Sequence, residues 1–141
     1  MKIIIDRSDL LKPLSHIQSV VERRNTIPIL SNVVIKADED YLFLSATDMD
    51  IDILEKFKCT VLKSGSITVT AHILYDIIRK LTDGSEILIE FTSGTASLSC
   101  NNSKFQLPVL PVEDYPTMFQ GDLPINFNLS VEELSRLIDT T

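Results

Sequence analysis

The sequence predicts an α+β domain in which two amphipathic helices pack against antiparallel β-strands. Residues 8–23 and 71–82 each carry apolar side chains at spacings of three and four, which is typical of one face of a helix. Most of the remaining chain consists of short β-prone runs separated by turn-forming residues. With 141 residues, 44% of them hydrophobic, the chain can bury a core of its own.

Charge and cysteine content narrow the class of protein. The chain has 20 Asp and Glu residues and 13 Lys and Arg residues, which gives a net charge of −7. This charge argues against a protein whose whole surface binds nucleic acid, but it is compatible with a local stripe of basic residues. Cys59 and Cys100 form no metal or redox motif and are expected as free, buried thiols in a reducing cytosol. The apolar run Ile3–Ile5 is too short for a signal peptide, and no stretch approaches the roughly 20 apolar residues of a membrane span. We therefore expect a cytoplasmic protein with no membrane segment.

The first helix follows the β-prone run at residues 3–5, and Ser8 is its expected N-cap. Its apolar and polar faces are offset by two residues, which is about 200° around a helix. The apolar face carries Leu10, Leu14, Ile17 and Val21, and the polar face carries Lys12, His16, Ser19 and Arg23. Pro13 removes one backbone hydrogen bond and should bend the helix, which ends at the break 24–28.

The middle of the chain is β-rich on either side of the second helix. Strands are expected at 29–37, 41–47, 49–62 and 67–70, and after the helix at 86–92, 95–100 and 103–107. Turn signals stand at 38–40, 63–66, 93–94 and 101–102. Pro108, Pro111 and Pro116 then indicate an irregular crossing segment, because proline cannot continue a sheet interior.

The second helix is expected from Ala71 to Thr82, with Asp83-Gly84 ending it. Its apolar side carries Leu74, Ile77, Ile78 and Leu81, and its other side shows His72, Asp76, Arg79 and Asp83.

The pattern of the first residues returns near the end of the chain. After a break at 122–124, Phe127–Leu129 is β-prone, and Ser130–Glu133 has the form of a capping box before a further helix. Aligning Phe127 with Ile3 places Leu134 on Leu10. We therefore expect one domain at 1–122 and, at 123–141, the first strand and helix of an incomplete second module, so that the chain is interpreted as a fragment.

Four segments together resemble one protein family. They are residues 10–14 (LLKPL), 26–32 (TIPILSN), 44–51 (LSATDMDI) and 110–116 (LPVEDYP). In this order and spacing they are similar to the N-terminal third of bacterial DNA sliding clamps, the β subunit of DNA polymerase III. The resemblance implies the DNA-clamp fold, in which helices line the inner face of a ring and sheets form its outer rim.

The resemblance also implies a function and partners. A clamp is a non-catalytic subunit that encircles double-stranded DNA and tethers DNA polymerase III. Its ring is a head-to-tail homodimer of three-domain subunits. Its groove for peptide motifs of the polymerase and the clamp loader lies between domains two and three, outside the residues of this chain.

Basic residues on or next to the two helices are the candidate DNA contacts: Lys12, Arg23, Arg24, Arg79 and Lys80. Taken from the sequence alone, these charges fit an ordinary solvated helix face. The resemblance favours contacts to phosphate that ignore base sequence, which suits a sliding protein. Arg24 matches an arginine that touches duplex DNA in related clamps. His72 and Ile73 depart from the pattern, since some relatives are basic there.

The last predicted strand of the domain is the candidate subunit edge. By the resemblance, Lys104, Phe105 and Leu107 of this strand, with Ile77 and Leu81 of the second helix, contact the third domain of the other subunit. The alternative from the sequence alone is ordinary core packing. Because an exposed apolar edge strand needs a partner, the chain by itself is expected as a monomer or as a weak non-native dimer.

No catalytic or metal site is predicted, and no cofactor is expected. Asp48, Asp50 and Asp52 fail the calcium-loop template, which would need Gly at Ile53 and Glu at Cys59, so we expect them on the wet face of a strand. Two other functions remain as alternatives: an α/β protein-interaction module without a DNA role, and a small hydrolase with clustered titratable groups in a cleft.

Overall fold

The computed structural model describes residues 1–116 and 123–141. Its elements in chain order are β1 (Lys2–Asp6), α1 (Arg7–Val20), the 3-10 helix η1 (Pro28–Ser31), β2 (Asn32–Asp38), β3 (Tyr41–Thr47), β4 (Asp52–Lys58), β5 (Thr60–Lys63), β6 (Gly65–Thr70), α2 (Ala71–Lys80), β7 (Glu86–Thr92), β8 (Thr95–Cys100), β9 (Ser103–Pro108), the 3-10 helix η2 (Val112–Asp114) and α3 (Val131–Asp139). The predicted α+β class is confirmed.

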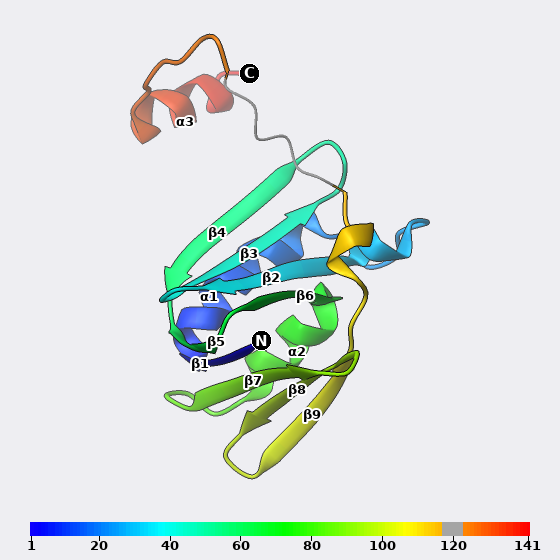
Figure 1. Ribbon diagram of the computed structural model, residues 1–141. Helices are drawn as coiled ribbons and strands as arrows, with labels where there is room; N and C mark the ends of the chain where they lie inside the picture. Colours follow the sequence, from blue (N-terminus) through cyan, green and yellow to red (C-terminus); the bar gives the residue numbers. More distant parts are fainter. Residues whose placement is uncertain (117–122) are drawn as a thin grey trace.

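The strands form two antiparallel sheets, with α1 and α2 on one side of both (Figure 1). The five-stranded sheet has the order β5-β1-β7-β8-β9, and the four-stranded sheet has the order β4-β3-β2-β6. Both sheets therefore expose edge strands, among them β4 and β9.

The two halves of the domain exchange strands. Each half is a strand, a helix and a three-strand meander, namely β1-α1-β2-β3-β4 and β6-α2-β7-β8-β9. The strand β1 pairs with β7 of the second half, and β6 pairs with β2 of the first half. Each sheet is thus completed by a strand from the other half.

The core lies between the helices and the sheets. Its largest fully buried side chains are Ile3, Leu10, Leu14, Ile17, Ile35, Leu42, Leu44, Ile67, Leu74, Ile78, Ile87 and Leu98. The predicted apolar face of α1 is confirmed, since Leu10, Leu14 and Ile17 are 0% exposed and Val21 is 4% exposed.

Several sequence-based element boundaries are wrong. The strand expected from residue 29 begins at Asn32, after η1, and the second helix ends at Lys80 instead of Thr82. The N-cap of α1 is Asp6, whose carboxylate accepts hydrogen bonds from the N–H (2.8 Å) and hydroxyl (2.6 Å) of Ser8. Ser8 is a helical residue instead. The strand expected at 49–62 is two strands, because β4 pairs with β3 while β5 pairs with β1 of the other sheet. The Cys59 N–H, at the junction, donates to the Asp40 carbonyl at 3.0 Å.

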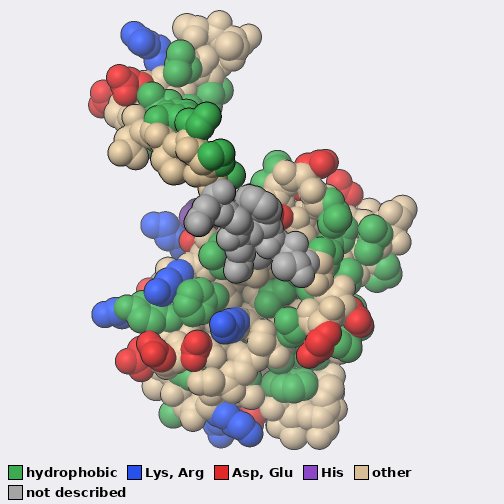
Figure 2. All heavy atoms as spheres, turned by 45° about the horizontal axis from the view of Figure 1, so that its top comes forward, with side chains coloured by type: hydrophobic (Ala, Val, Ile, Leu, Met, Phe, Trp, Pro, Cys, Tyr) green, Lys and Arg blue, Asp and Glu red, His purple; other side chains and the backbone are tan. Residues whose placement is uncertain are grey.

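The C-terminal residues form a helix with the predicted cap. The Ser130 hydroxyl accepts from the Glu133 N–H, and the Glu133 carboxylate accepts from the Ser130 N–H, both at 3.2 Å. Every residue from 123 to 141 is exposed, and hydrophobic side chains gather on the visible surface of this segment (Figure 2). The expected strand at 127–129 is absent from the structure, since no described residue pairs with it. The predicted domain boundary at 122 falls outside the described residues.

No helix in the ranges 1–116 and 123–141 is both long enough and apolar enough to cross a membrane.

Candidate functional site

The helices α1 and α2 run antiparallel and are tied together at both ends. At one end the Arg7 guanidinium donates through Nε to the Ile78 carbonyl (3.0 Å) and through Nη2 to the Arg79 carbonyl (2.8 Å), and it also pairs with Asp83. These carbonyls belong to the last turn of α2, at the negative end of its dipole, and the Ile78 carbonyl also accepts the C-cap hydrogen bond from the Leu81 N–H (3.3 Å). Arg7 therefore caps α2 across the fold, a role that the sequence pattern did not reveal.

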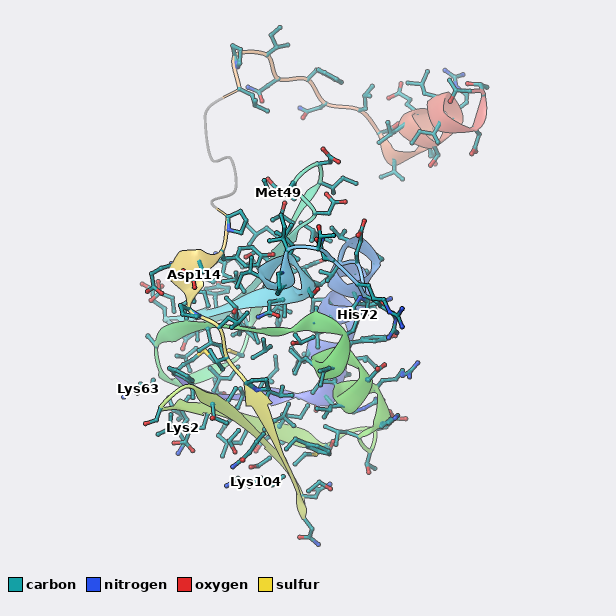
Figure 3. All side chains as sticks on the ribbon, turned by 90° about the vertical axis from the view of Figure 1, so that its right-hand side faces the viewer. Lys2, Met49, Lys63, His72, Lys104 and Asp114 are labelled. Carbon is teal, nitrogen blue, oxygen red and sulfur yellow. The ribbon has the colours of Figure 1, made fainter. Side chains whose placement is uncertain are left out.

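At the other end His72 contacts the residue that terminates α1. The Nε2 atom of His72 lies 2.8 Å from the Val21 carbonyl oxygen, and the His72 residue is 8% exposed. The prediction of a polar, solvent-facing His72 is thus wrong. It stands in the first turn of α2, where the end of α1 covers it (Figure 3).

All the predicted DNA-contact residues are exposed and lie along this helix pair. Lys12 stands on α1, and Arg23 and Arg24 follow its C-terminal end. Arg79 and Lys80 occupy the last turn of α2, at the opposite end of the pair. The helix pair thus carries cations at both ends. On the face seen in Figure 2, basic and acidic side chains are interspersed.

The basic residues differ in their local partners. Arg79 Nη2 is 3.2 Å from the Asp76 carboxylate, and its guanidinium lies 5.6 Å from the centre of the Tyr75 ring. Within the part of the chain that the structure describes, Arg23 and Arg24 make no ion pair. Of the five predicted contact residues only Arg79 is in an ion pair with a described residue, so its charge is the least available to an external anion.

The predicted edge strand β9 is at the edge of its sheet, and only part of its predicted apolar contact is accessible. Lys104 is exposed and Phe105 is half-buried. Leu107 is 5% exposed and belongs to the core, so its expected place on an exposed joint is wrong. Leu107 pairs with buried Ala96 and packs in the core. Phe105, two residues away, lies on the same face of the sheet and is only partly covered by the core.

A groove of about 340 Å³ lies between α2 and β9. It is lined by Ile73, Asp76, Ile77, Lys80, Leu81, Ser103 and Phe105. Three of the predicted joint residues, Ile77, Leu81 and Phe105, therefore lie together. Ile73, which is 46% exposed, was missed by the sequence reasoning, although its spacing of four from Ile77 places the two on one helix face.

A buried polar network joins the motif segments that carry the family resemblance. The Tyr115 hydroxyl accepts from the Thr47 N–H (3.0 Å) and donates to the Asn32 carbonyl (3.3 Å). The Asn32 amide donates to the Thr68 hydroxyl (3.0 Å), which donates to the Leu110 carbonyl (2.9 Å). This network anchors the segment that leaves the domain after β9.

The aspartates at 48–52 do not share a strand face as expected. The Asp48 carboxylate accepts from the N–H groups of Ile51 (2.7 Å) and Asp50 (2.9 Å), and these bonds lower the pKa of Asp48. It holds a turn in which Met49 adopts φ +79°. Across residues 1–116 and 123–141, no group of three or more His, Cys, Asp or Glu side chains could hold a metal ion.

Comparison with known proteins assigns the family. Residues 1–119 match the family model described as DNA polymerase III beta subunit, N-terminal domain. The chain is 46% identical over 143 residues to the beta sliding clamp of Caulobacter vibrioides and 36% identical over 142 residues to that of Pseudomonas aeruginosa. These alignments cover 100% of this chain but 38% and 39% of the relatives.

Solved structures agree with this assignment over the same length. Caulobacter crescentus pol III beta superposes with a TM-score of 0.96 at 46% identity, covering 100% of this chain and 38% of that one. A Bartonella birtlesii sliding clamp bound to griselimycin superposes with a TM-score of 0.96 at 45% identity, with the same coverages. The chain thus spans well under half the length of the relatives it matches, and it belongs to the DNA polymerase III beta subunit family.

Proposed function

We propose that residues 1–141 are the N-terminal part of a sliding clamp subunit, whose ring encircles duplex DNA and tethers DNA polymerase III. The observation that carries this proposal is the likeness of the full chain to solved sliding clamps, at a TM-score of 0.96 and 46% identity. In this proposal residues 1–122 are the first domain, and residues 123–141 begin the second. The protein acts as a non-catalytic accessory subunit in the cytoplasm.

The antiparallel pair α1/α2 is the proposed DNA-facing surface. Lys12, Arg23, Arg24, Arg79 and Lys80 are exposed along it. Lys and Arg side chains near phosphate release condensed counterions, which attracts duplex DNA without reading its bases. A protein that slides needs contacts of this kind, since hydrogen bonds to particular base edges would create stopping places.

The groove between α2 and β9 is the proposed joint with the third domain of a second subunit. In this proposal Ile77 on α2, Leu81 at its C-cap and Phe105 on β9 contact the partner from the groove. Lys104 contacts it from the exposed part of β9, and Leu107 packs beneath in the core. β9 has unpaired backbone groups along its outer side, because it ends its sheet. A head-to-tail joint needs a different surface on each partner, so the ring requires further domains. Contacts to polymerase and clamp loader lie in those domains.

Retention on DNA of different topology tests this function. The subunit comprising this chain and two further domains is loaded by its clamp loader onto a nicked circular duplex. We expect it to stay bound through gel filtration on the circle and to be lost once the DNA is cut to a linear form. Equal retention on circular and linear DNA would contradict encirclement, and an absence of any salt-dependent association would favour an interaction module without a DNA role.

A further inference from the structure

His72 is buried where the start of α2 meets the end of α1. Its Nε2 atom lies 2.8 Å from the Val21 carbonyl oxygen. A carbonyl can only accept, so Nε2 carries the hydrogen of this bond. The other ring nitrogen, Nδ1, is buried and has no hydrogen-bond partner among the described residues. The ring is thus committed to a single polar contact, with Val21.

Val21 is the last residue that fixes the direction of the chain as it leaves α1. It is the C-cap, with extended backbone angles φ −79° and ψ 124°, and its N–H donates to the Ile17 carbonyl at 3.3 Å. The backbone from 22 to 26 makes no further hydrogen bond within the described part of the chain. The Asn25 side chain accepts only a local bond, from the Ile27 N–H at 2.9 Å. Among the described residues, the bond from His72 to Val21 is therefore the hydrogen bond nearest to Arg23 and Arg24 that comes from another element.

We propose that His72 is a positioning residue for DNA binding, which acts through Val21 to hold Arg23 and Arg24 against the phosphate backbone. The inference rests on the proposed function and adds a buried hydrogen-bond donor behind a set of exposed cations. Without this bond the exit from α1 samples other directions. If it occupied the competent arrangement about a third of the time, DNA affinity would fall about threefold.

The test compares variants that differ in their reach to Val21. His72→Leu keeps an apolar side chain and removes the donor. His72→Gln carries its amide nitrogen near the position of Nε2, so it should restore the bond, whereas the shorter His72→Asn should not. The measured quantity is the affinity of the protein for a fluorescent 30-mer duplex at about 50 mM salt, because phosphate contacts are strong at low salt. The temperature of the measurement is far below the melting temperature of each variant.

We expect about threefold weaker binding for His72→Leu and His72→Asn, with binding close to wild type for His72→Gln. A melting curve identifies any variant that does not fold, and His72→Asn then replaces His72→Leu in the comparison. In an Arg23→Ala/Arg24→Ala background, His72→Asn should have no further effect on affinity, since a positioning residue acts only through the groups it positions.

The outcomes separate the two proposals. Wild-type protein that shows no salt-dependent affinity would refute the DNA contact itself. Salt-dependent binding that Arg24→Ala weakens and His72→Asn leaves unchanged would overturn the positioning role alone. A fall in melting temperature for His72→Asn with unchanged affinity would likewise reduce His72 to a structural residue.

Discussion

The Tyr115 hydroxyl accepts a 3.0 Å hydrogen bond from the backbone N–H of Thr47, a residue at the end of β3. The same hydroxyl donates to the Asn32 carbonyl at the start of β2. A single side chain from the segment after β9 thus secures two strands of the other sheet. It joins the motif segments 26–32, 44–51 and 110–116.

Tyr115→Phe should destabilise the domain by about 1–3 kcal/mol, because it leaves the buried Thr47 N–H without an acceptor. The measurement is the urea midpoint, with the slope m unchanged from wild type. Tyr41→Phe is the matched control, since the Tyr41 hydroxyl makes no hydrogen bond to a described residue. Equal midpoints for Tyr115→Phe and wild type would contradict a structural role for the hydroxyl.

The same residue predicts a difference at alkaline pH. Burial raises the pKa of Tyr115 above its ordinary value of 10.0. The unfolded chain then ionises first, so the contribution of Tyr115 is fully present below about pH 10 and is lost as pH rises toward the folded pKa. Wild type should lose more stability than Tyr115→Phe between about pH 9 and pH 11. Parallel losses for the two proteins would contradict this assignment.

Arg7 should matter more for stability than its ion pair. Arg7→Lys is expected to cost about 1–3 kcal/mol, because lysine cannot supply two directed donors to the Ile78 and Arg79 carbonyls. Asp83→Ala removes only the exposed partner, whose side chain is 93% exposed, and should cost about 0–1 kcal/mol. Thermal unfolding of both variants checks this ranking. An equal loss of stability in the two variants would contradict it.

Asp48 is expected to make the domain sensitive to acid. Its folded pKa is lowered by the bonds from Ile51 and Asp50, so its contribution is present above the ordinary value of 3.8 and is lost as pH falls through the folded pKa. Asp48→Asn keeps the acceptor and removes the charge, whereas Asp48→Ala removes both. Between about pH 7 and pH 2, the melting temperature of wild type should fall further than that of Asp48→Asn. At neutral pH, Asp48→Ala should be the least stable of the three.

Arg24→Glu should weaken DNA association with little change in melting temperature, because Arg24 is exposed and makes no ion pair with a described residue. Removing one cation from a phosphate should lower the slope of log affinity against log salt by roughly 0.9. The control is Lys63→Glu, the same change of charge on β5, on the opposite side of the domain from His72 (Figure 3). An unchanged slope and affinity for Arg24→Glu would remove it from the interface.

Association of the chain with itself should depend on Phe105. The chain alone is expected to be a monomer at low concentration, or a weak dimer in which β9 pairs with its twin. Phe105→Lys should abolish such a dimer, and Gln106→Lys, which adds the same charge on the other face of β9, should affect it less. Light scattering over a concentration series measures this. A stable ring-sized oligomer of this chain alone would overturn the assignment of the joint.

Local pattern and resemblance were enough to predict the apolar faces of the helices, the sheet edge at β9 and the exposure of the cations. Long-range pairing was beyond them. Residues 49–62 alternate with one period and contain no Gly or Pro, so nothing in the sequence marks where β4 ends and β5 joins the other sheet. His72 has helical spacing with polar residues, yet the end of α1 covers it. Arg7 reaches α2 across 71 positions of sequence, which no periodicity reports.

The exchange of β1 and β6 between the two halves has a consequence for how the chain folds. β1 is the second strand of its sheet, and its partner β7 begins at Glu86. During synthesis β1 therefore cannot pair with β7 until most of the domain has been made. Contacts of such long sequence separation slow folding, and they make it difficult for either half to persist alone. The domain should accordingly unfold in one cooperative step, with no stable half-folded species.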